Sequence, residues 1–358
     1  MKVGLIGLPF SGKTALFEAI TGPHGVAMDR SGAAHVATVP VPDERLEFLA
    51  GIASPRKVTP AHISFVDVAG VTSDADVQRA AVRLGPVRDT DGLVHVIRFF
   101  EWPSAPPHPR GSLDPVRDAR EVEAELICTD LEVVERRIEK LENQIRKHSP
   151  HLEQERRELA LLERLRDALA SGQRASSLKM SRDEATSLHA FQLLTDKPIL
   201  TVLNVREDEI SSPAVRQVTA LLEPDTVVIC AKLEKEIAEL EPGERAEFIE
   251  GLGIGEPAAK RIIRACYEKI GLRSFFTGVA AGDELRAWTI RAGETALDAA
   301  AKVHSDMARG FIRAEVVNYA EVRTLGSMKA AREHNKIRLE GKEYVVQDGD
   351  IIHFRFKV

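Results

Sequence analysis

The sequence predicts an α/β fold built around a phosphate-binding loop, with an inserted helical hairpin and a C-terminal β-grasp domain. Three observations predict it. An apolar strand at Val3–Ile6 leads directly into Gly7–Thr14, which matches the pattern G-x-x-x-x-G-K-[ST] without a mismatch. A charged tract at Val122–Leu169 repeats apolar residues with the period of a coiled-coil seam. From Leu285 onward, short strands surround a single helix.

The phosphate-binding loop needs the residue types that it has. Gly7 and Gly12 let the backbone curl so that successive N–H groups point at phosphate oxygens. Lys13 adds a charge for the β- and γ-phosphates and is the first catalytic candidate, while the hydroxyl of Thr14 can hold Mg²⁺. The following helix, Thr14–Ile20, adds the positive end of its dipole. The alternative is a chance glycine-rich turn. The nucleotide-binding candidates here are Phe10, Ser11, Gly12, Lys13, Thr14 and Ala15.

Length and composition set the outer limits. The 358 residues are enough for two or three domains. With 49 basic and 55 acidic residues, the net charge of −6 gives no sign of a strongly basic nucleic-acid surface. The chain has no secretory signal pattern, no apolar run of about 18 residues and no metal or redox spacing among its three cysteines. We therefore expect a cytoplasmic protein with no membrane partner, and nothing demands more than a monomer.

The segment after the first helix shows no periodicity. Gly22–Ala37 is rich in glycine, alanine and small polar residues and is predicted to be a loop, where a switch segment would lie. Its hydroxyl candidates for a second metal contact, Ser31 and Thr38, have no convincing context, so that ligand stays unassigned. A helix is predicted at Glu44–Gly51.

A second strand brings the metal-facing carboxylate. Ala61–Val68 alternates as a strand and ends in the pattern D-x-x-G, from Asp67 to Gly70. At this distance from the phosphate-binding loop, Asp67 is expected to face Mg²⁺ and the Gly70 N–H to face the γ-phosphate. The alternative is a simple turn at the end of a strand.

The next stretch contains a buried strand and then the helical insertion. Gly92–Phe99 is almost continuously apolar, as in a buried parallel strand, and the proline-rich Trp102–Gly111 must be irregular. Two long helices joined at His148–Pro150 should form an antiparallel hairpin whose charged face is solvated or meets a partner. Ser181 and Glu184 are predicted to form a capping box. The apolar positions of the hairpin include Val122, Ile127, Leu131, Val134, Ile138, Leu141, Ile145, Leu159, Leu162, Leu165 and Leu169.

Two later strands end in candidate base-reading loops. Lys197–Leu203 leads into Asn204, Val205 and Glu207, where guanine-specific enzymes have N-K-x-D. The missing lysine and the longer Glu207 compromise a guanine pocket and favour adenine or relaxed choice. The strand Thr226–Ile229 leads into the second base-reading segment, Cys230, Ala231 and Lys232.

The C-terminal segment fits a β-grasp fold. Strands are predicted at Leu285–Ile290, Phe311–Val317 and Ile351–Phe356 around a helix at Ala296–Met307, with Gly349 in a tight turn. Such domains usually bind RNA or protein. Possible phosphate contacts are Arg309, Arg313, Lys336 and Arg338.

These stretches together resemble the YchF subfamily of Obg-like ATPases over essentially the whole chain. The matching sequences include GLPFSGKTALFEAIT, VPVPDERLEFLA, FVDVAG, KPILTVLNVRED, CAKLEKEIAEL and GKEYVVQDGDIIHFRFKV. The resemblance implies a Ras-like G domain at 1–115 and 196–275, interrupted by the helical domain at 116–195 and followed by a TGS domain at 276–358. It also implies a preference for ATP over GTP, for which Asn204-x-x-Glu207 is the signature, and association with ribosomes and with translation or stress responses.

The chain also departs from the family pattern. The segments corresponding to both mobile lids, Ala27–Ala37 and the run after Gly70, are altered, and Val71 stands where the wider fold places a water-orienting glutamine. His108, in a stretch resembling a family loop near the nucleotide, is the candidate to position the attacking water, with an ordinary loop histidine as the alternative. The leading interpretation is an Mg²⁺-dependent ATPase switch. The alternatives are a nucleotide-binding regulator with little hydrolysis and an Obg-type GTPase.

Overall fold

The computed structural model describes residues 1–22, 27–28, 34–68, 84–103, 105–147, 151–252, 255–279 and 283–357. The chain forms two compact units. The first comprises Met1–Thr38 and Ser64–Ala259, and the second comprises Val39–Ile63 and Lys260–Val358. Within the described residues, no helix is long and apolar enough to cross a membrane.

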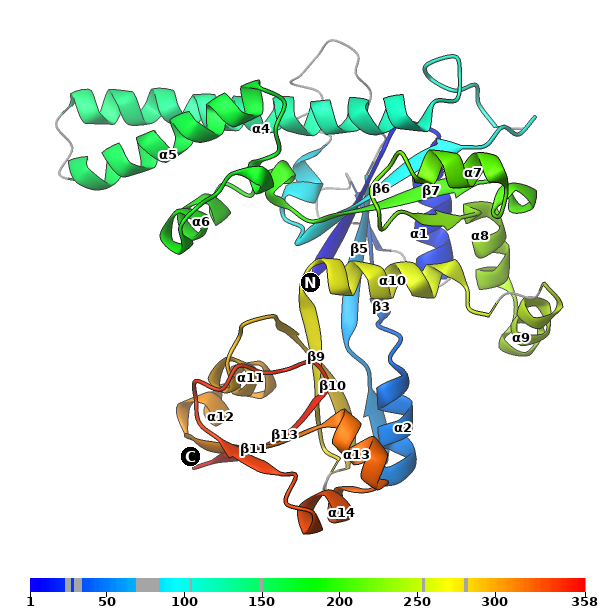
Figure 1. Ribbon diagram of the computed structural model, residues 1–358, viewed down its shortest axis with the longest axis vertical. Coiled ribbons are helices and arrows are strands. Elements are labelled where there is room, and N and C mark those ends of the chain that lie inside the picture. The colour runs from blue at the N-terminus through cyan, green and yellow to red at the C-terminus, as the bar shows by residue number, and fades with distance from the viewer. Residues whose placement is uncertain are drawn as a thin grey trace. The chain divides into compact units, whose positions relative to one another are not determined.

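The first unit is built on a seven-stranded sheet in the order β2-β3-β5-β1-β6-β7-β8. Figure 1 labels β3, β5, β6 and β7 of this sheet. Five neighbouring strands run parallel to one another, namely β5, β1, β6, β7 and β8. The strands are β1 (Lys2–Ile6), β2 (Ala27–Met28), β3 (Ala34–Pro40), β5 (His62–Val68), β6 (Gly92–Phe99), β7 (Ile199–Val205) and β8 (Val227–Ile229). The helices are α1 (Lys13–Thr21), α4 (Pro115–Arg146), α5 (Leu152–Ala170), η1 (Ala175–Ser177), α6 (Arg182–His189), η2 (Leu194–Asp196), η3 (Glu207–Glu209), α7 (Pro213–Thr219), α8 (Ala231–Glu239) and α9 (Pro242–Gly251).

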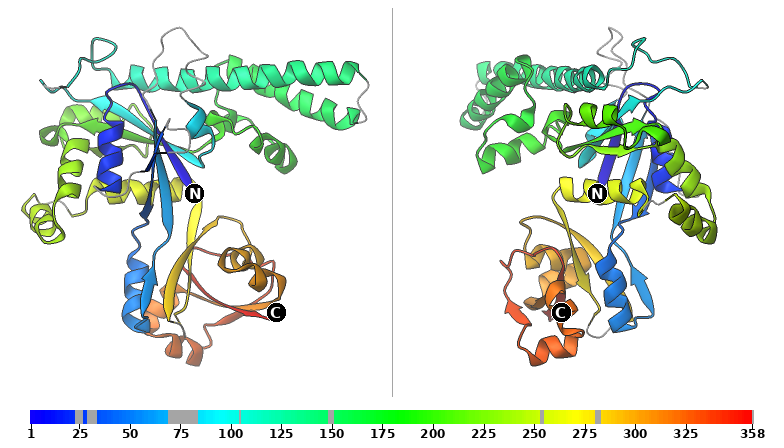
Figure 2. Two further views of the ribbon diagram at one scale, coloured as in Figure 1. Left: turned by 180° about the vertical axis from the view of Figure 1, so that it is seen from behind. Right: turned by 45° about the vertical axis from the view of Figure 1, so that its right-hand side comes forward.

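Helices cover the central strands, so these strands are buried on both faces. Seven of the eight residues of β6 are buried, as expected for the middle of a parallel sheet. Val122 and Leu126 of α4 pack with Ile6, Val66 and Leu93 of the sheet. Helices α1 and α8 lie side by side (Figure 2).

The predicted helical hairpin is confirmed in α4 and α5. Pro115 opens α4 behind Asp114, whose side chain accepts a hydrogen bond from the Arg117 N–H, so this helix start is both capped and preorganised. The seam buries apolar side chains of both helices. The capping box of Ser181 and Glu184 is confirmed at the start of α6. The predicted turn at His148–Pro150 lies outside the described residues.

The second unit contains a six-stranded sheet in the order β12-β11-β13-β9-β10-β4. Small residues of α11, among them Ala296, Ala299 and Ala300, pack against Phe275 and Ile352 of the sheet. The predicted tight turn holds Gly349 at φ 83°, a conformation that favours glycine. The elements are α2 (Glu44–Ala53), β4 (Lys57–Thr59), α10 (Ala258–Lys269), β9 (Leu272–Thr277), β10 (Glu284–Arg291), α11 (Ala296–Val303), α12 (Ser305–Arg309), β11 (Phe311–Asn318), α13 (Tyr319–Leu325), α14 (Met328–Glu333), β12 (Arg338–Glu340) and β13 (Asp350–Phe356).

The structure differs from the sequence-based expectations at several places. Gly22–Ala37 is not a loop throughout, because Ala27–Met28 pairs antiparallel with β3. The expected helix Ala296–Met307 breaks at His304, which has extended backbone dihedrals and caps α12 with its own side chain.

The division into units also differs from the expected boundaries. Val39–Ile63, expected in the G domain at 1–115, belongs to the C-terminal unit, where β4 pairs with β10. Strand β9 begins at Leu272, so the C-terminal sheet starts before the expected boundary at 276. The helical insertion 116–195 stays within the first unit. Strand pairing decides these boundaries, and it joins segments that are far apart in the sequence.

Candidate nucleotide-binding site

The loop between β1 and α1 has the curled backbone that its sequence predicts. Gly12 caps α1 in a left-handed conformation with φ 95°, and Phe10 also has a positive φ of 62°. A Cβ atom on Gly12 would lie 2.2 Å from Asn204 Nδ2, so no larger residue fits there without a shift. Phe10 is 54% exposed, so its side chain lies at the surface of the loop.

The Lys13 ammonium lies beneath this loop. Its Nζ donates hydrogen bonds to the carbonyl oxygens of Leu8, at 2.9 Å, and Gly7, at 3.2 Å. Burial lowers the pKa of Lys13 to about 8, and the negative charge of Asp67 opposes that shift. The loop therefore holds a buried cation that a phosphate anion would stabilise.

Thr14 and Asp67 meet at the carboxyl end of β5. Thr14 Oγ1 donates a hydrogen bond of 2.9 Å to Asp67 Oδ2. The second carboxylate oxygen, Oδ1, is buried and has no hydrogen-bond partner among the described residues. Burial raises the pKa of Asp67, against the effects of the Thr14 hydrogen bond and the Lys13 charge. A hydroxyl and an unpartnered carboxylate oxygen are hard ligands of the kind that Mg²⁺ takes.

Asn204 connects the phosphate-binding loop to the second candidate base-reading segment. Its Nδ2 donates to the Ser11 carbonyl at 3.0 Å, and its Oδ1 accepts from the Ala231 N–H at 2.9 Å. Both the Nδ2 and the Oδ1 of Asn204 are therefore engaged in hydrogen bonds within the protein. Asn204 positions the two loops relative to each other.

A cavity of about 220 Å³ adjoins these loops. Trp102 forms part of its wall, with Lys232 Nζ 4.6 Å from the ring centroid. Such a cation–π contact fixes the aromatic face beside the cavity. The lining residues are Gly12, Ala15, Phe100, Trp102, Ala105, Asn204, Val205, Cys230, Ala231 and Lys232.

The structure brings most of the predicted site residues together, with three exceptions. Glu207 is exposed on η3 and does not line the cavity. Gly70 lies outside the described residues. His108 is also absent from the cavity wall: its Nε2 lies 2.8 Å from Asp118 Oδ2, and its Nδ1 accepts a hydrogen bond from the Arg110 N–H. The imidazole is buried between these partners, and its catalytic role stays a prediction.

The sequence analysis missed Phe100, Trp102 and Ala105 as lining residues. They follow β6, which lies next to β1 in the sheet, so they emerge at the same edge as the phosphate-binding loop. The rule that ligands bind beyond the carboxyl ends of parallel strands could have found them. Among the described residues, no group of three or more His, Cys, Asp or Glu side chains is arranged to hold a metal ion.

Comparison with known proteins gives consistent matches over the full length. The chain is 39% identical over 373 residues to the ribosome-binding ATPase YchF of Bacillus subtilis, covering all of both chains. It is 35% identical over 366 residues to the protein of the same name from Escherichia coli O157:H7, covering 100% of this chain and 99% of the relative. The family model YchF-GTPase_C, described as a protein of unknown function, matches residues 272–357.

Two solved structures share the fold. The Schizosaccharomyces pombe YchF GTPase superposes with a TM-score of 0.81 at 26% identity, covering 99% of this chain and 97% of that one. A GTP-binding protein from Pyrococcus horikoshii OT3 superposes with a TM-score of 0.60 at 19% identity, with full coverage of both chains.

Proposed function

This chain belongs to the YchF family, and we propose that it binds ATP with Mg²⁺, hydrolyses it and acts as a nucleotide-dependent switch on the ribosome. The observation that carries the proposal is the buried Lys13 ammonium beneath the loop of residues 7–14. Its only described hydrogen bonds go to two backbone carbonyls, and burial disfavours its charge. The β- and γ-phosphates would supply the missing counter-charge.

Mg²⁺ would be held by Thr14 and Asp67. The unpartnered Oδ1 of Asp67 supports a metal at this position, because a bound cation would stabilise an oxygen that otherwise has no partner. Held there, Mg²⁺ would supply positive charge that offsets the negative charge of the phosphates. Lys13 would bind the transferred phosphoryl group, and the backbone N–H groups around Gly12 would orient it.

The cavity beside Trp102 supports ATP in preference to GTP. Guanine recognition needs a carboxylate that accepts from the ring N1–H and the 2-amino group, and no described residue lining the cavity carries one. Glu207 lies outside the lining, and both polar groups of Asn204 are engaged by Ser11 and Ala231. An adenine base requires no such carboxylate, and Trp102 offers an aromatic surface.

Ribosome association is proposed from the relatives, which are named ribosome-binding ATPases. It would place the protein in the cytoplasm, and we propose that it acts there as a monomer. The helical hairpin and the C-terminal unit are the proposed contact regions for ribosomal RNA or protein. ATP binding would order the segments around the γ-phosphate and change the affinity for the ribosome.

Equilibrium binding of ATP and GTP in the presence of Mg²⁺ tests the nucleotide part of the proposal. Wild type and Lys13→Ala are compared, and phosphate release is followed in the same samples. We expect selective ATP binding and turnover that both depend on Lys13. Binding without turnover would instead indicate a nucleotide-binding regulator, GTP preference would contradict the assignment of the base pocket, and binding of neither would refute the proposal.

Co-sedimentation with ribosomes tests the switch. We expect the bound fraction to differ between ATP and ADP in wild type and to lose that difference in Lys13→Ala. Equal sedimentation with both nucleotides would refute the switch but leave the ATPase.

A further inference from the structure

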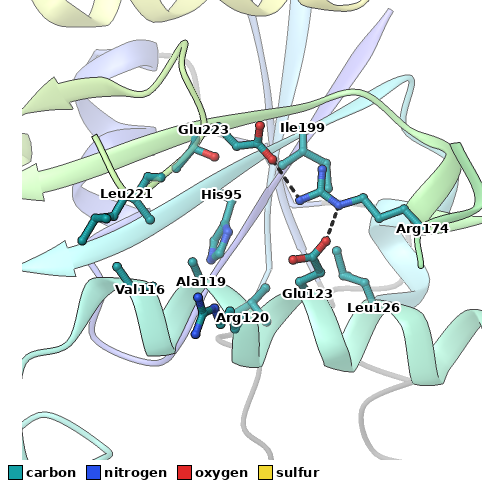
Figure 3. A pocket seen from close by; sticks show the side chains of 13 residues that line it. His95, Val116, Ala119, Arg120, Glu123, Leu126, Arg174, Ile199, Leu221 and Glu223 are labelled. Carbon is teal, nitrogen blue, oxygen red and sulfur yellow. Dashed lines mark hydrogen bonds and ion pairs between the residues drawn. The ribbon is translucent and has the colours of Figure 1, made fainter. Parts of the chain in front are cut away.

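A second cavity, of about 310 Å³, lies between α4 and strands β6 and β7 in the first unit (Figure 3). We call it the α4 cavity. It shares no lining residue with the cavity beside Trp102. Its wall consists of His95, Val116, Ala119, Arg120, Val122, Glu123, Leu126, Arg174, Ile199, Thr201, Leu221, Leu222 and Glu223.

Two polar side chains stand side by side on its sheet wall. His95 of β6 and Thr201 of β7 are register partners in adjacent parallel strands. They are only 8% and 5% exposed, and neither side chain has a hydrogen-bond partner among the described residues. Figure 3 shows His95 extending from its strand toward α4. The middle of a parallel sheet normally carries apolar residues, so two adjacent polar side chains that line a cavity there are unusual. The pair therefore points to a ligand.

The charged groups at the cavity are unequally satisfied. Arg174 bridges Glu123 and Glu223, with Nε 2.5 Å from Glu123 Oε1 and Nη2 3.3 Å from Glu223 Oε1. Both carboxylates are thereby engaged by one guanidinium (Figure 3). Arg120, in contrast, has no ion-pair partner among the described residues. The hydrogen-bonding groups of the wall that have no partner among the described residues are therefore mainly donors. They are the Arg120 guanidinium, the Thr201 hydroxyl and one N–H of a neutral His95.

The rest of the wall is aliphatic. Val122, Leu126 and Ile199 are examples, and together with Ala119 they offer an apolar surface to the body of a ligand. Pockets that bind small molecules combine such walls with a few convergent polar groups. A ligand that fits has an apolar body and an acceptor-rich anionic head.

We propose that the α4 cavity binds a small organic carboxylate, whose head group accepts hydrogen bonds from Arg120, His95 and Thr201. Arg120 supplies the preference for an anion, because it has no ion-pair partner among the described residues, whereas Glu123 and Glu223 share the single guanidinium of Arg174. The aliphatic side chains bury the body of the ligand and thereby favour an organic anion over an inorganic one, which has no apolar surface. The site requires no nucleotide.

Calorimetric titration of the full chain with three probes of one shape tests the proposal: benzoate, benzamide and benzylamine. We expect saturable binding of benzoate, about tenfold weaker binding of the neutral amide, and no binding of the amine. Arg120→Gln should weaken benzoate about tenfold and remove its advantage over benzamide. His95→Phe, which keeps an aromatic ring but loses both nitrogens, should weaken benzoate by a similar factor.

Steric variants on α4 locate the binding. Ala119→Leu fills the cavity and should abolish benzoate binding, whereas Ala124→Leu, on the exposed side of the same helix, should leave it unchanged. Circular dichroism and ATP binding of each variant show whether it is folded and keep this test separate from that of the ATPase.

Three results would overturn the proposal. They are no saturable benzoate binding by folded wild type up to about 10 mM, equal binding of all three probes, and benzoate binding that survives Ala119→Leu. In the first case the cavity holds ordered water only.

Discussion

Arg45 and Asp348, which lie 303 positions apart in the sequence, form an ion pair with Arg45 Nη1 2.6 Å from Asp348 Oδ2. Arg45 also binds Asp43 through two nitrogens, and its guanidinium lies 5.4 Å from the centroid of the Phe276 ring. One side chain thereby joins the start of α2 to strand β9 and to the turn before β13. This contact adds to the pairing of β4 with β10, which makes the segment part of the C-terminal unit.

Arg45→Lys should destabilise that unit by about 1–2 kcal/mol, because a lysine keeps the charge but cannot reproduce the fork of hydrogen bonds. Thermal unfolding is followed by Trp288 fluorescence in a Trp102→Phe background, so that only the C-terminal unit reports. Arg56→Lys is the matched control: Arg56 pairs with Asp283, but both side chains are more than 80% exposed, and the change should stay within about 0.5 kcal/mol. Equal effects would show that the Arg45 geometry adds nothing.

ATP affinity should fall as pH rises above about 8. Phosphate binding favours charged Lys13, whose pKa is lowered to about 8 by burial, so the free protein loses this proton as pH rises through that value. Below it, affinity should not depend on Lys13 ionisation. Calorimetry between pH 7 and pH 9.5 measures how the dissociation constant for ATP depends on pH. At the alkaline end we expect binding to be accompanied by the uptake of about one proton. Lys13→Arg, which stays charged, should give a flat profile, and an equally steep one would assign the proton to another group.

Asp67→Asn should stabilise the nucleotide-free protein while removing Mg²⁺-dependent turnover. Burial raises the pKa of Asp67, so the carboxylate charge opposes folding at neutral pH, where the unfolded chain ionises freely. The amide removes that charge and keeps the size. We expect a higher melting temperature without ligand and a smaller increase on adding Mg²⁺ and ATP. A lower melting temperature without ligand would show that the carboxylate contributes more through Thr14 than it costs by burial.

Trp102→Leu should weaken ATP binding about tenfold, because an aromatic contact with a base contributes about 1–3 kcal/mol. Wild-type fluorescence should change on ATP binding. The chain has two tryptophans, so the signal should persist in Trp288→Phe and vanish in Trp102→Leu. Unchanged affinity in Trp102→Leu would mean that the base lies outside this cavity.

His108→Ala distinguishes the predicted catalytic role from a structural one. The buried contact with Asp118 leads us to expect a loss of about 1–3 kcal/mol in stability, since the carboxylate loses a close partner. A double-mutant cycle with Asp118→Ala should show coupling. Turnover is measured well below both melting temperatures. A fall of about hundredfold in kcat with unchanged stability would support water positioning by His108 instead.

Local patterns predicted the parts of this molecule that local chemistry determines. The loop from Gly7 to Thr14, the hairpin of α4 and α5 and the capping box at Ser181 follow from short spacings, and the structure contains them. Asp67 could be placed near Thr14 because parallel strands end at one edge of the sheet.

Other features depend on which strands become neighbours, and no spacing encodes that. The pairing of β4 with β10 moved the segment containing Arg45 to the C-terminal unit. The register of β6 against β7 sets His95 beside Thr201. Trp102 lies in a proline-rich loop without any motif, so only the position of β6 next to β1 reveals its role in the cavity.

The link from Asn204 to Ser11 and Ala231 has a thermodynamic consequence for ligand association. Because protein groups already hold this part of the phosphate-binding loop, an arriving nucleotide does not have to order it, and little conformational entropy is lost there. Asn204→Ala would remove both hydrogen bonds and transfer that ordering to the binding step. The loss of the amide would then make the entropy of ATP binding less favourable and would change the enthalpy of binding less.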